Sequence, residues 1–360
     1  MSKRQFVFIT ACFVQGSFMY TMYYYQIAAN ESWLTLIGGI LVGMLIASIY
    51  GKLYEMHYDK SSGCAKGLAE INEAVFGRFI GKFVSSLYVL TLVFSCSRML
   101  REAGQFVGGN LLMGINWVFI LAILVILCAF AAHNGVKYFA SVGTATCLFM
   151  YIFTIVLFVL LLPHSEIDFL LPIGKASAGT YFRGISLCSA LPFAELLALV
   201  VIAPDVKGNN RGNLKKELFY GILAGAPFIL ISVLRDTLVL GPLMSTFSYP
   251  GYEVIRLVNY KVFSNVESLY GIIIIFLMFF KSALLFLSIT RLASKILGCK
   301  QNFLFYVAVA GAVFFVSQKM AASNVALSEL VLNYAPYLLL TVNVALPGVT
   351  LITSYLKNKK

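Results

Sequence analysis

A proline and an ionisable side chain lie inside an apolar segment that has the length and composition of a membrane-spanning helix. Glu195 and Pro192 fall within an apolar stretch, roughly residues 181–203, that is long enough to span a bilayer. Pro192 removes a backbone donor and clashes with the carbonyl four residues back. A carboxylate near the bilayer centre costs about 2.5–3.5 kcal/mol or more if it faces lipid.

Two interpretations of this stretch stay open. One is a tolerated proline kink with an acid hydrogen-bonded inside a helix bundle. The other is a discontinuous helix whose freed backbone groups line a ligand pocket. In the second case, the residues expected to bind the ligand are Ser189, Ala190, Leu191, Pro192 and Phe193.

Lys281 is the cation expected to face Glu195. It follows the apolar run 272–280 and lies a few residues to the cytoplasmic side of the middle of its helix. That depth is too great for the ammonium to reach the interface cheaply, and opposite charges at such depth usually pair inside the bundle. The pair could be purely structural, or it could belong to a charged relay or gate.

A third group of charges lies near the outer end of another apolar segment. Arg98 and Glu102 are four residues apart, so they can pair on one helix face. Alternatively, Arg98 and above all Arg101 reach along the helix to the outer interface. Phe94 lies two turns before Glu102 on the same side, within reach of a bound side chain. We interpret Arg98, Glu102, Glu195 and Lys281 as the relay or gating residues.

The first apolar segment carries Gln15, Gly16 and Ser17 near its midpoint. A break there would present the N-terminus of a half-helix, whose N–H groups favour a carboxylate. The carbonyls freed around residues 189–191 favour an ammonium. The two breaks together suit a zwitterionic amino acid, with Gly16 allowing close backbone approach. The alternative is that Gln15 and Ser17 hydrogen-bond to other helices and that Gly16 is a packing residue.

The composition indicates which elements must position these residues. The chain has 360 residues, of which 60% are hydrophobic and 12% charged, whereas a soluble domain carries about 25% charged residues. With a mean hydropathy of +0.88, the chain is predicted to be an all-α integral membrane protein. Ten transmembrane helices are expected, at approximately 5–28, 33–53, 80–103, 115–133, 139–162, 181–203, 217–240, 266–290, 302–320 and 333–356.

The basic residues predict the orientation. If both termini are cytoplasmic, most of the 27 Lys and Arg residues fall on the inner side. The net charge of +12 is therefore a membrane signal and gives no reason to expect a nucleic-acid partner. Long linkers at 55–79 and 241–265 lie on opposite faces, and the interrupted first and sixth helices correspond. We therefore expect one transmembrane domain built as a 5+5 inverted repeat, residues 1–163 and 164–360.

Several classes of site find no support in the sequence. The seven cysteines stand singly, and His57, His133 and His164 lack metal-ligand spacing. Phosphate-binding and nucleophile motifs are absent as well. We expect no metal, no cofactor and no enzymatic activity.

Three stretches carry a resemblance to a known family. They are Arg235–Pro242 followed by Tyr249 and Pro250, then Val262, Phe263 and Glu267, together with Phe76–Lys82. Leu191, Pro192 and Phe193 fit the same pattern. The chain resembles the spore germination permeases, the membrane B subunits of nutrient germinant receptors within the amino acid–polyamine–organocation superfamily. The resemblance implies a ten-helix LeuT-like fold with broken helices 1 and 6. It further implies a membrane A subunit and a lipoprotein C subunit as partners, and an acid at Glu102 along a polar path beside the pocket.

Two functions follow as expectations. The first is a receptor subunit that binds a small germinant, with an amino acid as the expected class, in the spore inner membrane or the cell membrane. The second is a sodium-independent secondary transporter of amino acids or organocations. The family's fold implies a possible sodium site between the first and eighth helices, and Lys281 lies at about that depth. Like-charge repulsion at ~4 Å is about 4 kcal/mol at an effective dielectric of 20, which would abolish millimolar sodium binding.

Overall fold

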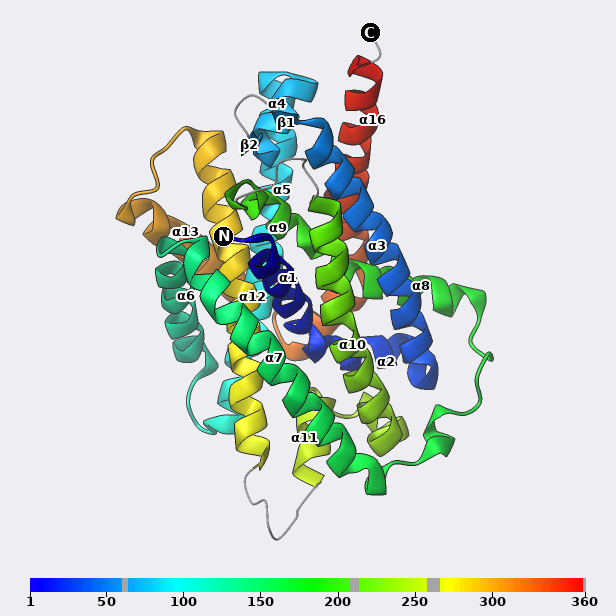
Figure 1. The fold of residues 1–360 in the computed structure, drawn as a ribbon. Coiled ribbons are helices and arrows are strands. Elements are labelled where there is room, and N and C mark those ends of the chain that lie inside the picture. Colours follow the sequence, from blue (N-terminus) through cyan, green and yellow to red (C-terminus); the bar gives the residue numbers. More distant parts are fainter. Residues whose placement is uncertain (60–63, 207–213, 258–265, 359–360) are drawn as a thin grey trace.

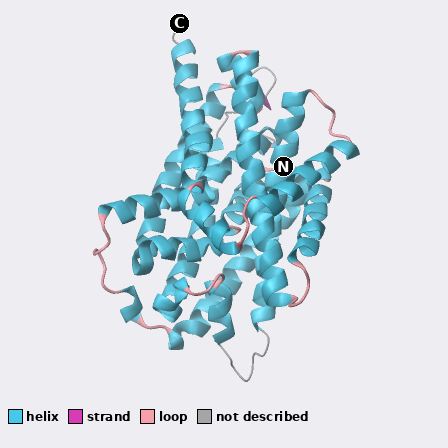
Figure 2. Cartoon of the chain, turned by 180° about the vertical axis from the view of Figure 1, so that it is seen from behind, coloured by secondary structure: helices cyan, strands magenta, loops and turns pink. Residues whose placement is uncertain are grey.

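The computed structural model describes residues 1–360 except 60–63, 207–213, 258–265 and 359–360. Val262 and Phe263, quoted above for the resemblance, lie outside the described residues. The described part is almost entirely helical, as Figures 1 and 2 show. In it, the only strands are β1 (Tyr58–Asp59) and β2 (Cys64–Ala65), which pair antiparallel. The prediction of an all-helical membrane fold is confirmed at this level.

The helices follow one another with few extended stretches between them. In the first half of the chain they are α1 (Lys3–Gln15), α2 (Thr21–Ala28), α3 (Ser32–Met56), α4 (Leu68–Phe76), α5 (Arg78–Phe106), α6 (Trp117–His133) and α7 (Val136–Leu161). In the second half they are α8 (Ala178–Cys188), α9 (Leu197–Ile202), α10 (Leu214–Leu240), α11 (Pro250–Leu257), α12 (Val266–Leu297), α13 (Phe303–Lys319), α14 (Asn324–Asn333), α15 (Ala335–Leu340) and α16 (Leu346–Asn358). Short 3₁₀ or π turns join them at Phe18–Tyr20, Ala29–Glu31, Val107–Leu111, Leu162–His164, Ile167–Leu170, Ser189–Phe193, Ala194–Leu196, Ala203–Asp205, Gly241–Ser245 and Thr341–Ala345.

The helices are long and apolar enough for repeated membrane crossing. Within the described residues, seven helical runs qualify, or eight if α13 and α14, which meet at 100°, count as one span. Large apolar side chains such as Leu45, Phe130 and Ile152 are exposed on the outside of the helix bundle, whereas Glu195 and Lys281 are buried inside it. This distribution is the one a bilayer requires, and the chain is a multi-pass membrane protein.

Two segments expected to be linkers contain structure of their own. The stretch 55–79 holds β1, β2 and α4, and the stretch 241–265 holds a 3₁₀ turn and α11. In α4, Leu68, Ile71 and Val75 are buried against the bundle at helical spacing. Membrane-length apolar runs do not predict such short amphipathic helices, because the other faces of these helices are polar.

Two helical runs change course in the middle of the bundle. After α1 ends at Gln15, Ser17 has φ −97° and ψ 5°, and regular α-helix resumes only at Thr21. After α8 ends at Cys188, a π-helical turn follows in which Leu191 has non-helical angles of φ −118° and ψ 95°. These irregular turns free backbone groups from the regular helical pattern.

A glycine face on α3 positions the second irregular turn. A Cβ added at Gly39 would lie 2.5 Å from Cys188 Cβ, and one at Gly43 would lie 2.5 Å from Phe193 Cγ. Close approach through small residues is the usual way in which membrane helices pack. The end of α8 and the turn after it are therefore held directly against the backbone of α3.

Candidate functional site

Four charged side chains form a continuous chain of contacts through the core. Arg98 Nη1 lies 3.2 Å from Glu102 Oε2, and Arg98 Nη2 lies 3.1 Å from Glu195 Oε1. The other oxygen of Glu195 forms an ion pair with Lys281. We call Glu102, Arg98, Glu195 and Lys281 the charge ladder. All four are at most 5% exposed, and burial at this level demands such pairing, because an unpaired charge would keep its full desolvation cost.

The ladder ends at the irregular turn between α1 and α2. Lys281 Nζ donates a hydrogen bond to Ser17 Oγ and lies 5.0 Å from the ring centre of Phe13. A Cβ on Gly16 would lie 2.9 Å from Lys281 Cβ and 3.0 Å from Leu277 O. The space beside Gly16 is thus filled by α12, and Gly16 serves a helix–helix contact in this structure. Figure 1 shows α1 and α12 lying together near the centre of the bundle.

Glu195, the acidic partner of Lys281, lies beside the second irregular turn. Glu195 lies in the 3₁₀ turn Ala194–Leu196 that comes next, and the peptide bond between Leu191 and Pro192 is cis. The hydroxyl of Tyr24 donates to the carbonyl of Leu191, and Ser189 Oγ donates to Ile185 O at 2.6 Å. The carbonyl of Leu191, expected to be open to a ligand ammonium, is therefore occupied by a tyrosine.

The structure brings together some of the residues expected at the site and separates others. Ser17 and the charge ladder meet in the core, including the expected contacts of Arg98 with Glu102 and of Lys281 with Glu195. Gln15 and Ala190 are fully buried, whereas Phe94 is only partly buried at the edge of the core. Phe193 packs its ring on Gly43 of α3.

Arg101 is held inside the bundle, which differs from the alternative interpretation that it reaches along the helix to the outer interface. Arg101 is only 3% exposed, and its Nη1 donates to the carbonyls of Ser317, Gln318 and Ala321 at 2.8–3.2 Å. The last carbonyls of α13 lack partners within the helix, so a guanidinium on the neighbouring α5 satisfies them. Arg98, three residues earlier, is instead bound to Glu102 and Glu195.

Sequence reasoning missed the tyrosines that surround the ladder. Tyr20 OH accepts a hydrogen bond from Arg98 Nη2 at 2.6 Å, and Tyr23 OH donates to Glu102 Oε1 at 3.0 Å. The sequence contains a pattern that could have indicated them, because Tyr23, Tyr24 and Tyr25 are consecutive in an apolar segment. Each buried hydroxyl in such a segment requires a partner.

A small crevice reaches the ladder from the end of the bundle near Tyr249. It has a volume of about 30 Å³ and is lined in part by Met19, Tyr23, Glu102 and Gln105. That volume is enough to hold a water molecule. Glu102 is therefore the ladder residue nearest to this entrance.

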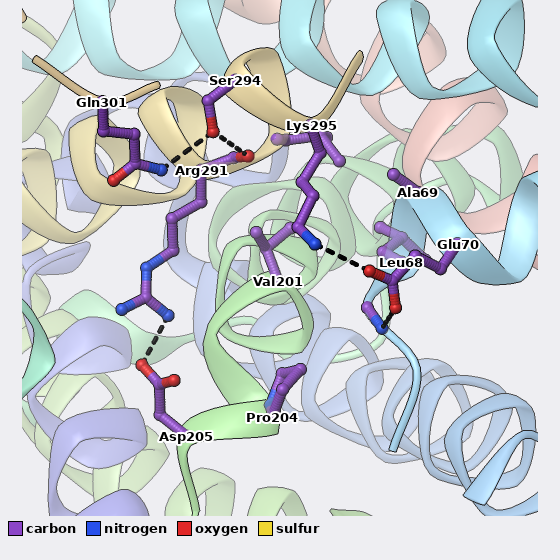
Figure 3. Close-up of a pocket in the computed structure, with 12 residues that line it drawn as sticks. Leu68, Ala69, Glu70, Val201, Pro204, Asp205, Arg291, Ser294, Lys295 and Gln301 are labelled. Atoms are coloured by element: carbon purple, nitrogen blue, oxygen red, sulfur yellow. Dashed lines mark hydrogen bonds and ion pairs between the residues drawn. The ribbon is translucent and has the colours of Figure 1, made fainter. Parts of the chain in front are cut away.

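A larger pocket lies at the other end of the bundle. It holds about 480 Å³ and is crossed by two ion pairs, shown in Figure 3. Arg291 Nη1 lies 2.5 Å from Asp205 Oδ2. One turn further along α12, Lys295 Nζ lies 2.8 Å from Glu70 Oε1. The hydrogen bond from Lys295 lowers the pKa of Glu70 below its ordinary value, which favours the ionised carboxylate in this pair.

A sequence model described as spore germination protein matches residues 1–326. The chain belongs to this family. One relative is spore germination protein KB of Bacillus subtilis (strain 168), which is 23% identical over 233 residues. The aligned part covers 61% of this chain and 60% of the relative, so the comparison spans less than two thirds of that relative's length. The resemblance identified from the sequence is confirmed.

Several solved structures of transporters resemble this fold. Mhp1, a nucleobase-cation-symport-1 family transporter in a closed conformation with bromovinylhydantoin bound, has a TM-score of 0.73 at 10% identity and covers 98% of this chain and 77% of its own. A Na⁺-coupled sialic acid symporter has a TM-score of 0.62 at 10% identity, with 94% and 79% covered. At these identities the likeness shows a shared LeuT-type transporter fold.

Proposed function

We propose that this chain is a membrane subunit of a spore nutrient receptor, which binds a small germinant between the two irregular turns and passes on a change of conformation. The contact of Lys281 with both Ser17 and Glu195 carries the proposal. It ties the α1–α2 turn to the residue that follows the second turn. A ligand that enters between these turns must break the contacts of Lys281 with Ser17 and Glu195.

The charges at this point favour a zwitterionic ligand, with an amino acid as the expected class. Breaking a buried pair without replacement costs about 3–5 kcal/mol, because it leaves an uncompensated charge. A ligand carboxylate could take the place of Glu195 beside Lys281, and a ligand ammonium could pair with the released Glu195. Gln15, Gly16 and Ser17 on one side and residues 189–193 on the other would frame it, with Phe94 as a side-chain contact.

We further propose ten spans arranged as a 5+5 inverted repeat, residues 1–163 and 164–360. The spans would be α1 with α2, then α3, α5, α6, α7, α8 with α9, α10, α12, α13, and α15 with α16. The first and sixth of these contain the irregular turns. The chain is placed in the spore inner membrane or the cell membrane, with both termini on the cytoplasmic side. The proposed partners are a membrane A subunit and a lipoprotein C subunit.

A second candidate is a sodium-independent transporter of amino acids or organocations. Two observations favour it: the transporter fold, and the ammonium of Lys281 beside Ser17, in the region where a cation would bridge α1 and α12. In both proposals the chain acts by binding and conformational change, without catalysis.

One pair of experiments separates the candidates. Spores lacking this chain should lose the response to at least one amino acid germinant, and proteoliposomes containing the purified chain should accumulate no labelled amino acid. Accumulation against a gradient would favour the transporter. Unchanged germination with every nutrient tested would contradict the receptor role.

A further inference from the structure

A shallow groove runs along the start of α5, on a face turned away from the core. It has a volume of about 460 Å³ and is lined by Arg78, Phe79, Lys82, Phe83 and Ser86. Spacings of three and four residues place these side chains on one side of the helix. The groove lies at the end of the bundle that carries α4 (Figure 1), which the proposed orientation places at the cytoplasmic interface.

Two positive charges enter this groove, and no carboxylate lines it. Arg78 is exposed, and within the described part of the chain no hydrogen bond or ion pair involves its side chain. Lys82 Nζ donates to Ile296 O at 2.9 Å, which fixes its position and leaves two of its three N–H bonds free. Two other cations at this end differ in having carboxylate partners, Lys52 with Glu55 and Lys295 with Glu70.

The rest of the groove is apolar and uncovered. Phe79 is 88% exposed and Phe83 61% exposed, and Leu90 continues the same face further along α5 at 63%. On a membrane-spanning helix such a face meets acyl chains, while the first helical turn lies at the depth of the lipid headgroups. Free cations beside exposed rings fit an amphipathic occupant better than a soluble ion, because an ion offers nothing to cover the rings.

We propose that this groove binds an anionic phospholipid. Its phosphate is held by Arg78, whose planar guanidinium matches two phosphate oxygens, and by the point charge of Lys82. Its acyl chain lies along Phe79 and Phe83. The groove is separate from the charge ladder, so the proposal stands independently of the germinant site.

The test titrates the purified full chain in detergent with phosphatidylglycerol or phosphatidylcholine and counts bound lipids by native mass spectrometry. Phosphatidylglycerol should bind more tightly than phosphatidylcholine. Arg78→Gln and Lys82→Gln should each weaken phosphatidylglycerol binding about fivefold, as expected for one basic residue near an anionic headgroup. Lys82→Arg should retain most of the affinity.

Lys52→Gln is the matched control, since it removes one charge at the same end of the bundle but at a paired site. It should leave phosphatidylglycerol binding unchanged. An equal loss of affinity in this variant would mean that binding depends on the total positive charge of the protein and not on this groove. Equal binding of the two lipids by the wild type would overturn the proposal. So would competition by glycerol phosphate as strong as that by phosphatidylglycerol, which would identify the ligand as a free anion.

Discussion

Glu102 is the ladder residue that a molecule entering beside Tyr249 would meet first. Its carboxylate accepts hydrogen bonds from Tyr23 and from Arg98, and through Arg98 it is joined to Glu195. Removing its charge therefore changes the ladder without removing a side chain from the packing.

We expect Glu102→Gln to impair signalling or permeation while assembly is retained. The amide loses the charged contact with Arg98, and such hydrogen bonds contribute about 1.5–3 kcal/mol, so the response should fall on the order of tenfold or more. Germination rate against nutrient concentration measures the effect. Glu329→Gln on α14 is the control, because Glu329 is exposed. A normal response in Glu102→Gln spores would make the acid structural.

Lys281 leads to a prediction about ions. Response or uptake should be unchanged when sodium is replaced by potassium, because the ammonium already occupies the region beside Ser17. Lys281→Ala should impair both, since it leaves Glu195 with one cation where it had two. A clear sodium requirement in the wild type would remove this role from Lys281.

The sequence predicted part of the ladder, for identifiable reasons. Arg98 and Glu102 share a helix, so their spacing alone brought them together. Lys281 and Glu195 could be matched because both lie deep in apolar segments. The contact between Arg98 and Glu195 could not be predicted, because it depends on how α5 is rotated toward the second irregular turn. Side-chain packing sets that rotation, and the spacing within one helix carries no record of it.

At the scale of elements, the fit of α1 against α12 depends on Gly16. Gly16→Leu should block the ligand response without abolishing expression, since the added atoms would meet Leu277 O and Lys281. Overpacking of this kind costs about 1–3 kcal/mol. The measurement is germinant response at equal protein levels in the spore membrane.

Gly311→Leu on α13 is the matched control, because a Cβ there meets no atom within 4 Å. It should respond as the wild type does. Normal sensitivity of Gly16→Leu to every germinant would exclude the α1–α2 turn from the site.

The long helices could be predicted from hydropathy, whereas α4 and α11 could not. Both lie in stretches too short and too polar to span a membrane, and their burial depends on partners distant in sequence. For example, Gly251 at the start of α11 lies against Arg235 and Asp236 of α10, with a Cβ there 3.0 Å from Arg235 Nη2. The motif around Arg235 was recognised as a family feature, but its contact with α11 is a property of the fold.

At the scale of the whole molecule, the proposed orientation predicts which cysteines are accessible. Cysteines introduced at Lys175 or Ser248 should react with a membrane-impermeant reagent from outside, and one at Asn302 should not. Asn209, outside the described residues, should also be protected. Native Cys299 is exposed at the same end as Asn302 and provides an internal control. The opposite labelling pattern would reverse the orientation.

The charge ladder also bears on how the protein responds to membrane voltage. Two cations and two anions are joined in it, so their formal charges cancel while the contacts hold. An electric field exerts little net force on such a set. Protonation of Glu102 would leave unbalanced charge within the field, and separation of Lys281 from Glu195 would move opposite charges apart within it. Moving one elementary charge across it is worth about 2.3 kcal/mol per 100 mV. The opening of the ladder, unlike its closed state, should therefore depend on the membrane potential.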